Sequence, residues 1–333
     1  MIRSERTSHM PTRTRAAYGL AALAVGAAVA VSACSSGSSS SSAAAGATSS
    51  SSSSSGSNPL SPGGTTTSVV VGSANFPENE LLAEIYALAL QDKGVKVTTK
   101  LSIGAREVYY PQIEKGAISI IPEYNGTLLT VEVDKASTAK TTDQVDAALA
   151  ASLPSTLTVL NPAPAQDSDS VTVTQATAAR DHLKSIGDLA PYAKDLTFGG
   201  PSEFTTRTDG LTGLKKNYGL TFKAFDPLDE SGPITLAALT SGKVQAADVF
   251  TTTPQIVTDH LVSLADPKFN FAAQNVIPLV YKPALTPTIT SVLNAVSAKL
   301  TTQALLQMDN AVITEHANYT TVATGFLKDE GLG

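Results

Sequence analysis

Residues 69–90 read VVVGSANFPENELLAEIYALAL and join a short β-branched run to an amphipathic segment. The run at residues 69–71 is typical of a buried strand. After it, Leu81, Leu82 and Ile85 share one face of a helix that we expect over residues 77–90, with acidic side chains in its first turn. A strand followed by a helix is the repeating unit of a parallel sheet covered by helices, so we expect an α/β fold.

The same alternation continues along the chain and is interrupted by a proline-rich break at residues 161–165. Two mainly parallel sheets joined by two crossings would place a cleft between them, and ligands in such sheets bind beyond the carboxyl ends of the strands. The further strands are expected at residues 95–101, 118–121, 171–173, 196–198, 221–225 and 246–250, and the further helices at 107–115, 213–218, 234–241, 288–299, 302–310 and 320–329.

The first 33 residues have the pattern of a secretory signal peptide. Residues 1–15 carry four arginines and one acid, and the apolar run at 16–31 is followed by small residues up to Cys34. Val-Ser-Ala before Cys34 resembles a bacterial lipobox, in which the chain is cut before the cysteine and its thiol is acylated. The alternative is a retained membrane helix, for which the apolar run is short.

Residues 35–68 consist almost entirely of Ser, Ala, Gly and Thr. Such a segment has nothing to bury and is predicted to be a flexible, disordered tether. With a lipid on Cys34 at one end and a folded body at the other, we expect the protein at the extracytoplasmic face of the cell membrane.

The composition excludes several classes of protein. The 333 residues include one cysteine, so neither an internal disulfide nor a zinc site of four cysteines can form. A net charge of −6 argues against nucleic acid as a partner. The motifs Gly-x-Ser-x-Gly, His-Glu-x-x-His and Gly-x-x-x-x-Gly-Lys are absent from the sequence, so we expect no enzyme activity, no metal and no cofactor.

Four motifs in order carry a family resemblance. They are GSANFPEN at 72–79 followed by LAEI at 82–85, GAI at 116–118 running into PEYNGT at 122–127, Glu203-Phe204 with Arg207 and DGL at 209–211, and GKVQAADVF at 242–250. Together they resemble the osmoprotectant-type (glycine betaine, choline, carnitine) solute-binding proteins of ABC transporters, the ProX-like family. The resemblance extends over essentially all of residues 69–333.

The resemblance implies a type II periplasmic-binding-protein fold with a ligand cleft between two lobes. Lobe 1 is expected to comprise residues 69–166 and 275–333, and lobe 2 residues 167–274. The resemblance also implies a monomeric receptor that binds a small molecule and delivers it to a membrane permease driven by an ATPase. The alternative is a lipid-anchored sensing or cell-envelope protein that kept this fold for a polar or aromatic ligand other than an osmolyte.

Similar proteins hold a quaternary ammonium group between aromatic faces, while arginine and backbone donors hold a carboxylate. By this resemblance Tyr124 and Phe250 match positions of the aromatic cage, Thr127 lines the same site, and Arg207 is the carboxylate clamp. The full set of ligand-binding candidates is Asn75, Phe76, Tyr124, Thr127, Asp169, Glu203, Arg207, Phe250, Thr252, Gln274 and Asn275.

The sequence also departs from the family pattern. Gln274 and Val171 stand at two further cage positions, and Ala74 stands where relatives often carry a lysine. We therefore expect a ligand that is more polar than betaine, or one that is flat and aromatic or polyol-like.

Several of these candidates, and Asp167, also have a purely structural interpretation. Tyr124 could pack a loop, Phe250 could belong to the core, and Glu203 with Arg207 could form a surface ion pair. Asp167 and Asp169 could be solvated loop acids.

Overall fold

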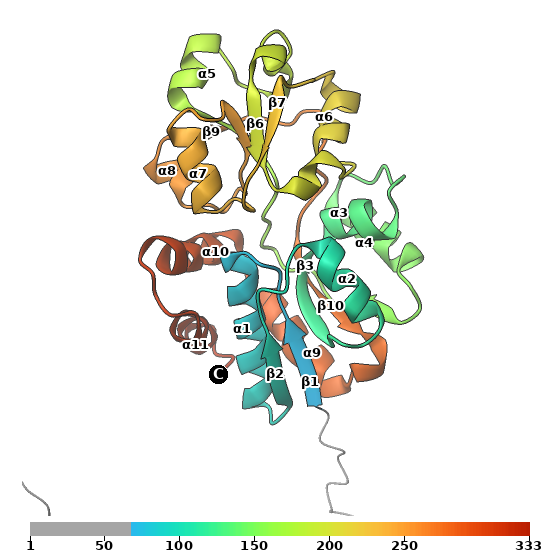
Figure 1. The fold of residues 1–333 in the computed structure, drawn as a ribbon. Helices are drawn as coiled ribbons and strands as arrows, with labels where there is room; N and C mark the ends of the chain where they lie inside the picture. The colour runs from blue at the N-terminus through green and yellow to red at the C-terminus, as the bar shows by residue number, and fades with distance from the viewer. Residues whose placement is uncertain (1–67) are drawn as a thin grey trace, which may run out of the picture. The chain divides into compact units, whose positions relative to one another are not determined.

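The computed structural model describes residues 68–333. The predicted signal peptide, Cys34 and the tether up to residue 67 lie outside the described residues. Residues 68–333 form two five-stranded sheets with helices packed against them (Figure 1).

The first sheet has the strand order β2-β1-β3-β10-β4. Its strands β1 (Ser68–Gly72), β2 (Lys96–Lys100), β3 (Ile120–Tyr124) and β4 (Leu157–Val159) share one direction. Strand β10 (Val276–Tyr281) is antiparallel to both of its neighbours, β3 and β4.

The second sheet has the order β7-β6-β8-β5-β9. Here β6 (Thr197–Gly200), β7 (Ala224–Pro227), β8 (Ala246–Asp248) and β9 (Leu261–Ser263) share one direction, and β5 (Val171–Thr174) opposes its neighbours β8 and β9. In each sheet the single opposing strand is the one that the chain enters after leaving the other sheet. The expected alternation, mainly parallel sheets and two crossings are confirmed.

Helices from both ends of the chain cover the first sheet. Helix α1 (Pro77–Asp92) packs against α9 (Pro287–Lys299) and α11 (Tyr319–Asp329), which confirms that the predicted C-terminal helices return to the first core. The other helices are α2 (Arg106–Glu114), α3 (Asn125–Thr127), α4 (Thr142–Ser152), α5 (Gln175–Asp181), α6 (Leu211–Tyr218), α7 (Pro233–Thr240), α8 (Gln255–Thr258) and α10 (Thr302–Asp309). Short 3₁₀ or π-helical segments are η1 (Leu128–Val133), η2 (Ile186–Leu189), η3 (Ala193–Asp195), η4 (Ser202–Thr205), η5 (Lys282–Ala284) and η6 (Asn310–Thr314).

The sequence analysis did not predict the strands β4, β9 and β10 or the helices α3, α4, α5 and α8. Helix α4 begins with a capping box, in which Thr141 and Gln144 each bond the other's backbone N–H, and this pattern was a usable signal. Helix α5 has only seven residues and few apolar side chains, so periodicity could not reveal it.

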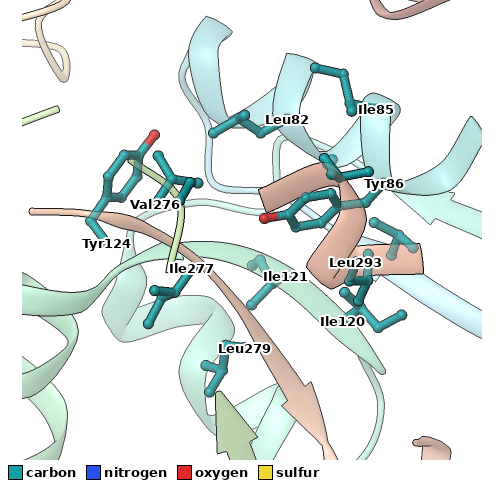
Figure 2. Close-up of a cluster of buried hydrophobic side chains, with 14 of the residues drawn as sticks. Leu82, Ile85, Tyr86, Ile120, Ile121, Tyr124, Val276, Ile277, Leu279 and Leu293 are labelled. Atoms are coloured by element: carbon teal, nitrogen blue, oxygen red, sulfur yellow. The ribbon is translucent and has the colours of Figure 1, made fainter. Parts of the chain in front are cut away.

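Aliphatic side chains and Tyr86, from four elements, form the centre of the first core (Figure 2). Tyr124, the last residue of β3, stands at the side of this cluster, next to Val276. Its position at the strand end places the ring outside the aliphatic centre. The labelled side chains of the centre are Leu82, Ile85 and Tyr86 from α1, Ile120 and Ile121 from β3, Val276, Ile277 and Leu279 from β10, and Leu293 from α9.

Replacement of Leu279 tests whether β10 holds the first sheet together. Leu279 is fully buried between β3 and β4, so Leu279→Ala should lower the free energy of unfolding by about 2–5 kcal/mol. Leu306→Ala, the same change at a side chain on α10 that is 38% exposed, is the control and should have little effect. Urea denaturation measures both, and equal effects of the two substitutions would contradict the assignment.

Candidate functional site

A cavity lies where several strands of the two sheets end. Its volume is about 30 Å³, and the space free of protein atoms rises to about 420 Å³ when the adjoining open solvent is included. The first sheet and its connections contribute residues 74, 76, 106, 109, 124 and 127, and segments that follow strands of the second sheet contribute residues 230 and 250. The complete lining is Ala74, Phe76, Arg106, Tyr109, Tyr124, Thr127, Asp167, Asp169, Arg207, Glu230, Phe250 and Gln274.

Three aromatic rings meet in this cavity. Phe76 caps the start of α1, Tyr124 ends β3, and Phe250 follows β8. The ring centroid of Phe76 lies 6.0 Å from that of Tyr124 and 5.1 Å from that of Phe250. With Tyr109, which also lines the cavity, the site has four aromatic residues, two more than the pair Tyr124 and Phe250 that the family motifs indicate.

The hydroxyl of Tyr124 is held by a buried acid at the first turn of α1. Tyr124 Oη donates a hydrogen bond of 2.5 Å to Glu78 Oε1, and Thr252 Oγ1 donates one of 2.6 Å to Glu78 Oε2. Thr252 follows a strand of the second sheet, so Glu78 ties segments of both sheets together. Burial, and next the charge of Asp309, raise the pKa of Glu78 well above its usual value.

Two further buried carboxyls lie close to Glu78. Asp309, at the end of α10, is 1% exposed, and neither of its oxygens has a hydrogen-bond partner within residues 68–333. Asp167 accepts a bond of 3.0 Å from the backbone N–H of Thr252. Burial, and next the charge of Glu78, raise the pKa of Asp167 well above its usual value.

Arg106 lines the cavity and forms a salt bridge with Glu123. Its guanidinium donates to Glu123 through Nε at 2.9 Å and through Nη2 at 2.9 Å, and Tyr109 Oη donates to the same carboxylate at 2.7 Å. Glu123 is fully buried in β3. Glu123, the partner of Arg106, directly precedes Tyr124 in β3.

Arg207 is paired with a residue that the sequence analysis did not consider. Its Nε and Nη2 donate to the two carboxylate oxygens of Glu107 on α2, at 3.0 and 3.1 Å. The alternative of a surface pair between Glu203 and Arg207 is wrong, because Arg207 is 8% exposed and only its backbone N–H bonds to Glu203, at the carbonyl oxygen. Glu203 is half-buried and does not line the cavity.

Three acids gather beside Arg207, of which Asp169 lines the cavity. Asp248 is fully buried, and neither of its oxygens has a hydrogen-bond partner among the described residues. Burial, and next the charge of Asp169, raise the pKa of Asp248, and the same two causes raise that of Asp209 to about 6. Asp167 and Asp169 are therefore not solvated loop acids but part of the cavity wall.

The side-chain amide of Gln274 bonds to the loop that follows β3. Gln274 Oε1 accepts a bond of 3.0 Å from the backbone N–H of Thr127, and Gln274 Nε2 donates to the Thr127 hydroxyl. A Cβ at Gly126 would collide with the carbonyl oxygen of Ala273, so glycine permits this close approach. Gln274 thus fixes the loop as well as lining the cavity.

The remaining candidates lie away from the cavity lining. Asn275 bonds to Asn125, to the hydroxyl of Thr142 and to the carbonyl of Ala163, which makes it a structural bridge. Asn75 is exposed, Thr252 acts through Glu78, and Val171 is fully buried within β5. The structure therefore does not place Val171 at a wall of this cavity.

The sequence analysis missed Arg106, Tyr109, Glu230, Glu78 and Asp309. Glu78 offered a signal, since it lies in the first turn of the helix that follows β1. Asp309 carried no such signal, because only the return of α10 to the first core brings it next to Glu78.

Two findings concern metals and membranes. Within residues 68–333, no three His, Cys, Asp or Glu side chains are arranged to hold a metal ion. In the same part of the chain, no helix combines the length and the apolar character that a membrane crossing requires.

Comparisons with known proteins give matches over most of the described residues. Residues 67–329 match the family described as the substrate binding domain of ABC-type glycine betaine transport systems. The chain is 28% identical to the glycine betaine-binding protein YehZ of Escherichia coli K12 over 79% of this chain and 90% of that protein. It is 25% identical to a glycine-betaine-binding protein of Pseudomonas aeruginosa over 79% of this chain and 88% of that one.

A solved structure shares the fold. The crystal structure of a glycine betaine/carnitine/choline ABC transporter superimposes with a TM-score of 0.62 and 23% identity, over 79% of this chain and 99% of that one. The expected fold, a type II periplasmic-binding-protein fold with two sheets and flanking helices, is confirmed.

The buried carboxyl of Asp309 should make stability depend on pH. Burial is the main cause that raises its pKa to about 8 in the folded protein, against about 3.9 in an unfolded chain. Because the folded state binds the proton more tightly, the stability from this group is complete below about pH 4 and is lost as the pH rises towards 8.

Asp309→Asn, which mimics the protonated carboxyl, should therefore raise the Tm at pH 8 by a few degrees and change it little near pH 4. About 1 kcal/mol corresponds to about 2–4 °C in a protein of this size. Thermal unfolding monitored by circular dichroism measures this, with Asp329→Asn at an exposed site of α11 as control. An equal gain at both pH values would contradict the explanation.

Proposed function

The chain belongs to the family of substrate-binding domains of ABC-type glycine betaine transport systems, and from this we propose that it binds a quaternary ammonium solute in the cavity described above. The observation that carries the proposal is the meeting of three rings, those of Phe76, Tyr124 and Phe250, in one cavity. A cation between aromatic faces is attracted by the ring quadrupoles, by about 0.5–2 kcal/mol for each good face.

Hydrogen bonds and ring contacts fix the orientation of these aromatic side chains. Glu78, which also accepts a hydrogen bond from Thr252, accepts the hydroxyl of Tyr124, and edge contact with Phe76 orients Phe250. Thr127 and Gln274 supply hydroxyl and amide groups at the cavity wall. We propose that this combination binds the solute without chemical change to it, so that the protein acts as a receptor and not as an enzyme.

We propose that the solute closes two lobes around itself, residues 69–166 with 275–333 and residues 167–274. Support comes from bonds that join the corresponding segments across the cavity, such as that between Thr252 and Glu78 and the pair of Arg207 with Glu107. Closure around a ligand is the usual motion of such two-lobed proteins. The closed monomer would then deliver its solute to a permease and its ATPase.

Substrate-binding proteins of ABC importers work outside the cytoplasm, and we propose that this one is held there by a lipid on Cys34. Removal of residues 1–33 would leave Cys34 as the first residue, followed by the polar tether at 35–68. Stable anchoring needs more than one acyl chain, and a diacylated and N-acylated cysteine supplies them. No feature of residues 68–333 favours a separate sensing or cell-envelope role.

Loss of one ring should weaken binding. Phe250→Ala is expected to raise the Kd for glycine betaine and for choline by about 2- to 30-fold, since about 0.5–2 kcal/mol is lost with one aromatic face. Phe269→Ala removes a ring that is 52% exposed and does not line the cavity, and it should leave both Kd values unchanged. Titration calorimetry decides this, and unchanged affinity in Phe250→Ala would exclude the ring from the site.

Replacement of the cysteine tests the anchor. Cys34→Ser should move the protein from the membrane fraction to the medium or periplasm and abolish its partition into the detergent phase of Triton X-114. Solute affinity should stay the same, because Cys34 lies more than thirty residues before β1. Retention of the variant in the membrane fraction would favour an uncleaved membrane helix instead.

A further inference from the structure

In the lining of the cavity the basic side chains have salt-bridge partners, and the acidic side chains have none in the part of the chain that the structure describes. It includes two arginines, Arg106 and Arg207, and three acids, Asp167, Asp169 and Glu230. Each arginine already forms a salt bridge with an acid that is not part of the lining. None of the three lining acids forms a salt bridge with another of the described residues.

Glu107 presents a carboxylate to Arg207 in the way that a ligand would. The contact is bidentate, at 3.0 and 3.1 Å, and uses the Nε–Nη2 edge of the guanidinium, which matches the geometry of a carboxylate. Although partial burial raises the pKa of Glu107, the hydrogen bond and charge of Arg207 outweigh it and hold that pKa below its usual value. Glu107 therefore remains ionised and bound to Arg207 at neutral pH.

The guanidinium of Arg106 likewise already has a carboxylate partner. Glu123, fully buried, accepts from both Nε and Nη2 of Arg106 and also accepts the hydroxyl of Tyr109. The positive charge of each lining arginine is thus neutralised before any solute enters.

The lining acids, by contrast, lack a positive partner. Oε2 of Glu230 is buried and has no hydrogen-bond partner within residues 68–333. Burial raises the pKa of Glu230 to about 7 even though Arg207 and Arg106 act in the opposite direction. Asp169 lies beside the buried and unpartnered Asp248, and Asp167 lies beside Glu78. A positive charge placed among these groups would relieve their mutual repulsion.

We propose that Glu107 is a specificity-determining residue, which occupies Arg207 as an internal carboxylate so that the cavity selects cations without a carboxylate. Asp167, Asp169 and Glu230 balance the charge of such a solute, and a hydroxyl or N–H on it can donate to them. A zwitterion with the same head group would instead bring its carboxylate towards these acids. This inference rests on the proposed function, because it assumes that the cavity is the solute site.

A matched set of three solutes tests the selection by charge. Choline and glycine betaine share the trimethylammonium group and differ in carrying a hydroxyl or a carboxylate, and 3,3-dimethylbutan-1-ol is the uncharged carbon analogue of choline. With the full chain at pH 7.5, titration calorimetry should give a Kd for choline at least tenfold lower than for either of the other two.

Substitutions then assign the selection to residues. Glu107→Gln should free Arg207 and reduce the ratio of the glycine betaine Kd to the choline Kd at least fivefold, mainly by tighter binding of glycine betaine. Asp169→Asn should weaken choline binding several-fold and does not depend on the pair of Glu107 with Arg207. Asp195→Asn removes an acid whose side chain is 72% exposed outside the cavity, and it should leave the ratio unchanged.

The outcomes separate this inference from the function on which it rests. If glycine betaine binds as tightly as choline or more tightly, the inference is overturned while the proposed function stands. If none of the three solutes binds, both are overturned. If choline is preferred but Glu107→Gln leaves the ratio unchanged while the variant remains folded, the role of Glu107 is overturned, whatever the effect of Asp169→Asn.

Discussion

The pairing of β3 with β10 is the constraint on which the rest of the molecule depends. It joins residues 120–124 to residues 276–280, which are about 150 positions apart in the chain, through five registered pairs. This pairing returns the chain from the second sheet to the first and brings the C-terminal helices onto α1. It also sets Tyr124 next to the segment of Gln274, and so defines one wall of the cavity.

A second constraint is the placement of acids in a partly closed site. Burial makes an ionised carboxylate unfavourable unless a cation or several donors accompany it. Glu123 and Glu107 have an arginine each, whereas Asp248 and Asp309 have neither a salt bridge nor a hydrogen-bond donor among the described residues. The unfavourable burial of these carboxyls occurs near the place where three aromatic rings also meet. Rings and unpaired acids both favour a positive charge, which gives two independent physical reasons for the same kind of ligand.

Much of the fold could be predicted from local patterns. The β-branched run at 69–71 and the apolar face from Leu81 to Ile85 are β1 and α1, and the C-terminal helices were expected within one residue of their starts. The site was predicted less completely. Tyr124 and Phe250 were found through family motifs, but Arg106, Tyr109 and Asp309 were not, since a polar residue on a helix carries no local sign of what it faces after folding.

By itself the sequence determined the α/β class, most of the helices and strands, and the presence of aromatic residues near strand ends, because hydrophobic periodicity is a local property. It did not reveal β4, β9 or β10, which are strands of the two sheets. Only the tertiary structure decided the partner of each charged group. Glu107 and Arg207 are one hundred residues apart, and Glu78 and Thr252 are farther still. Hydrogen bonds and Coulomb attraction act over a few ångströms, so which charges neutralise one another, and which remain for a solute, depends on the distances that folding creates.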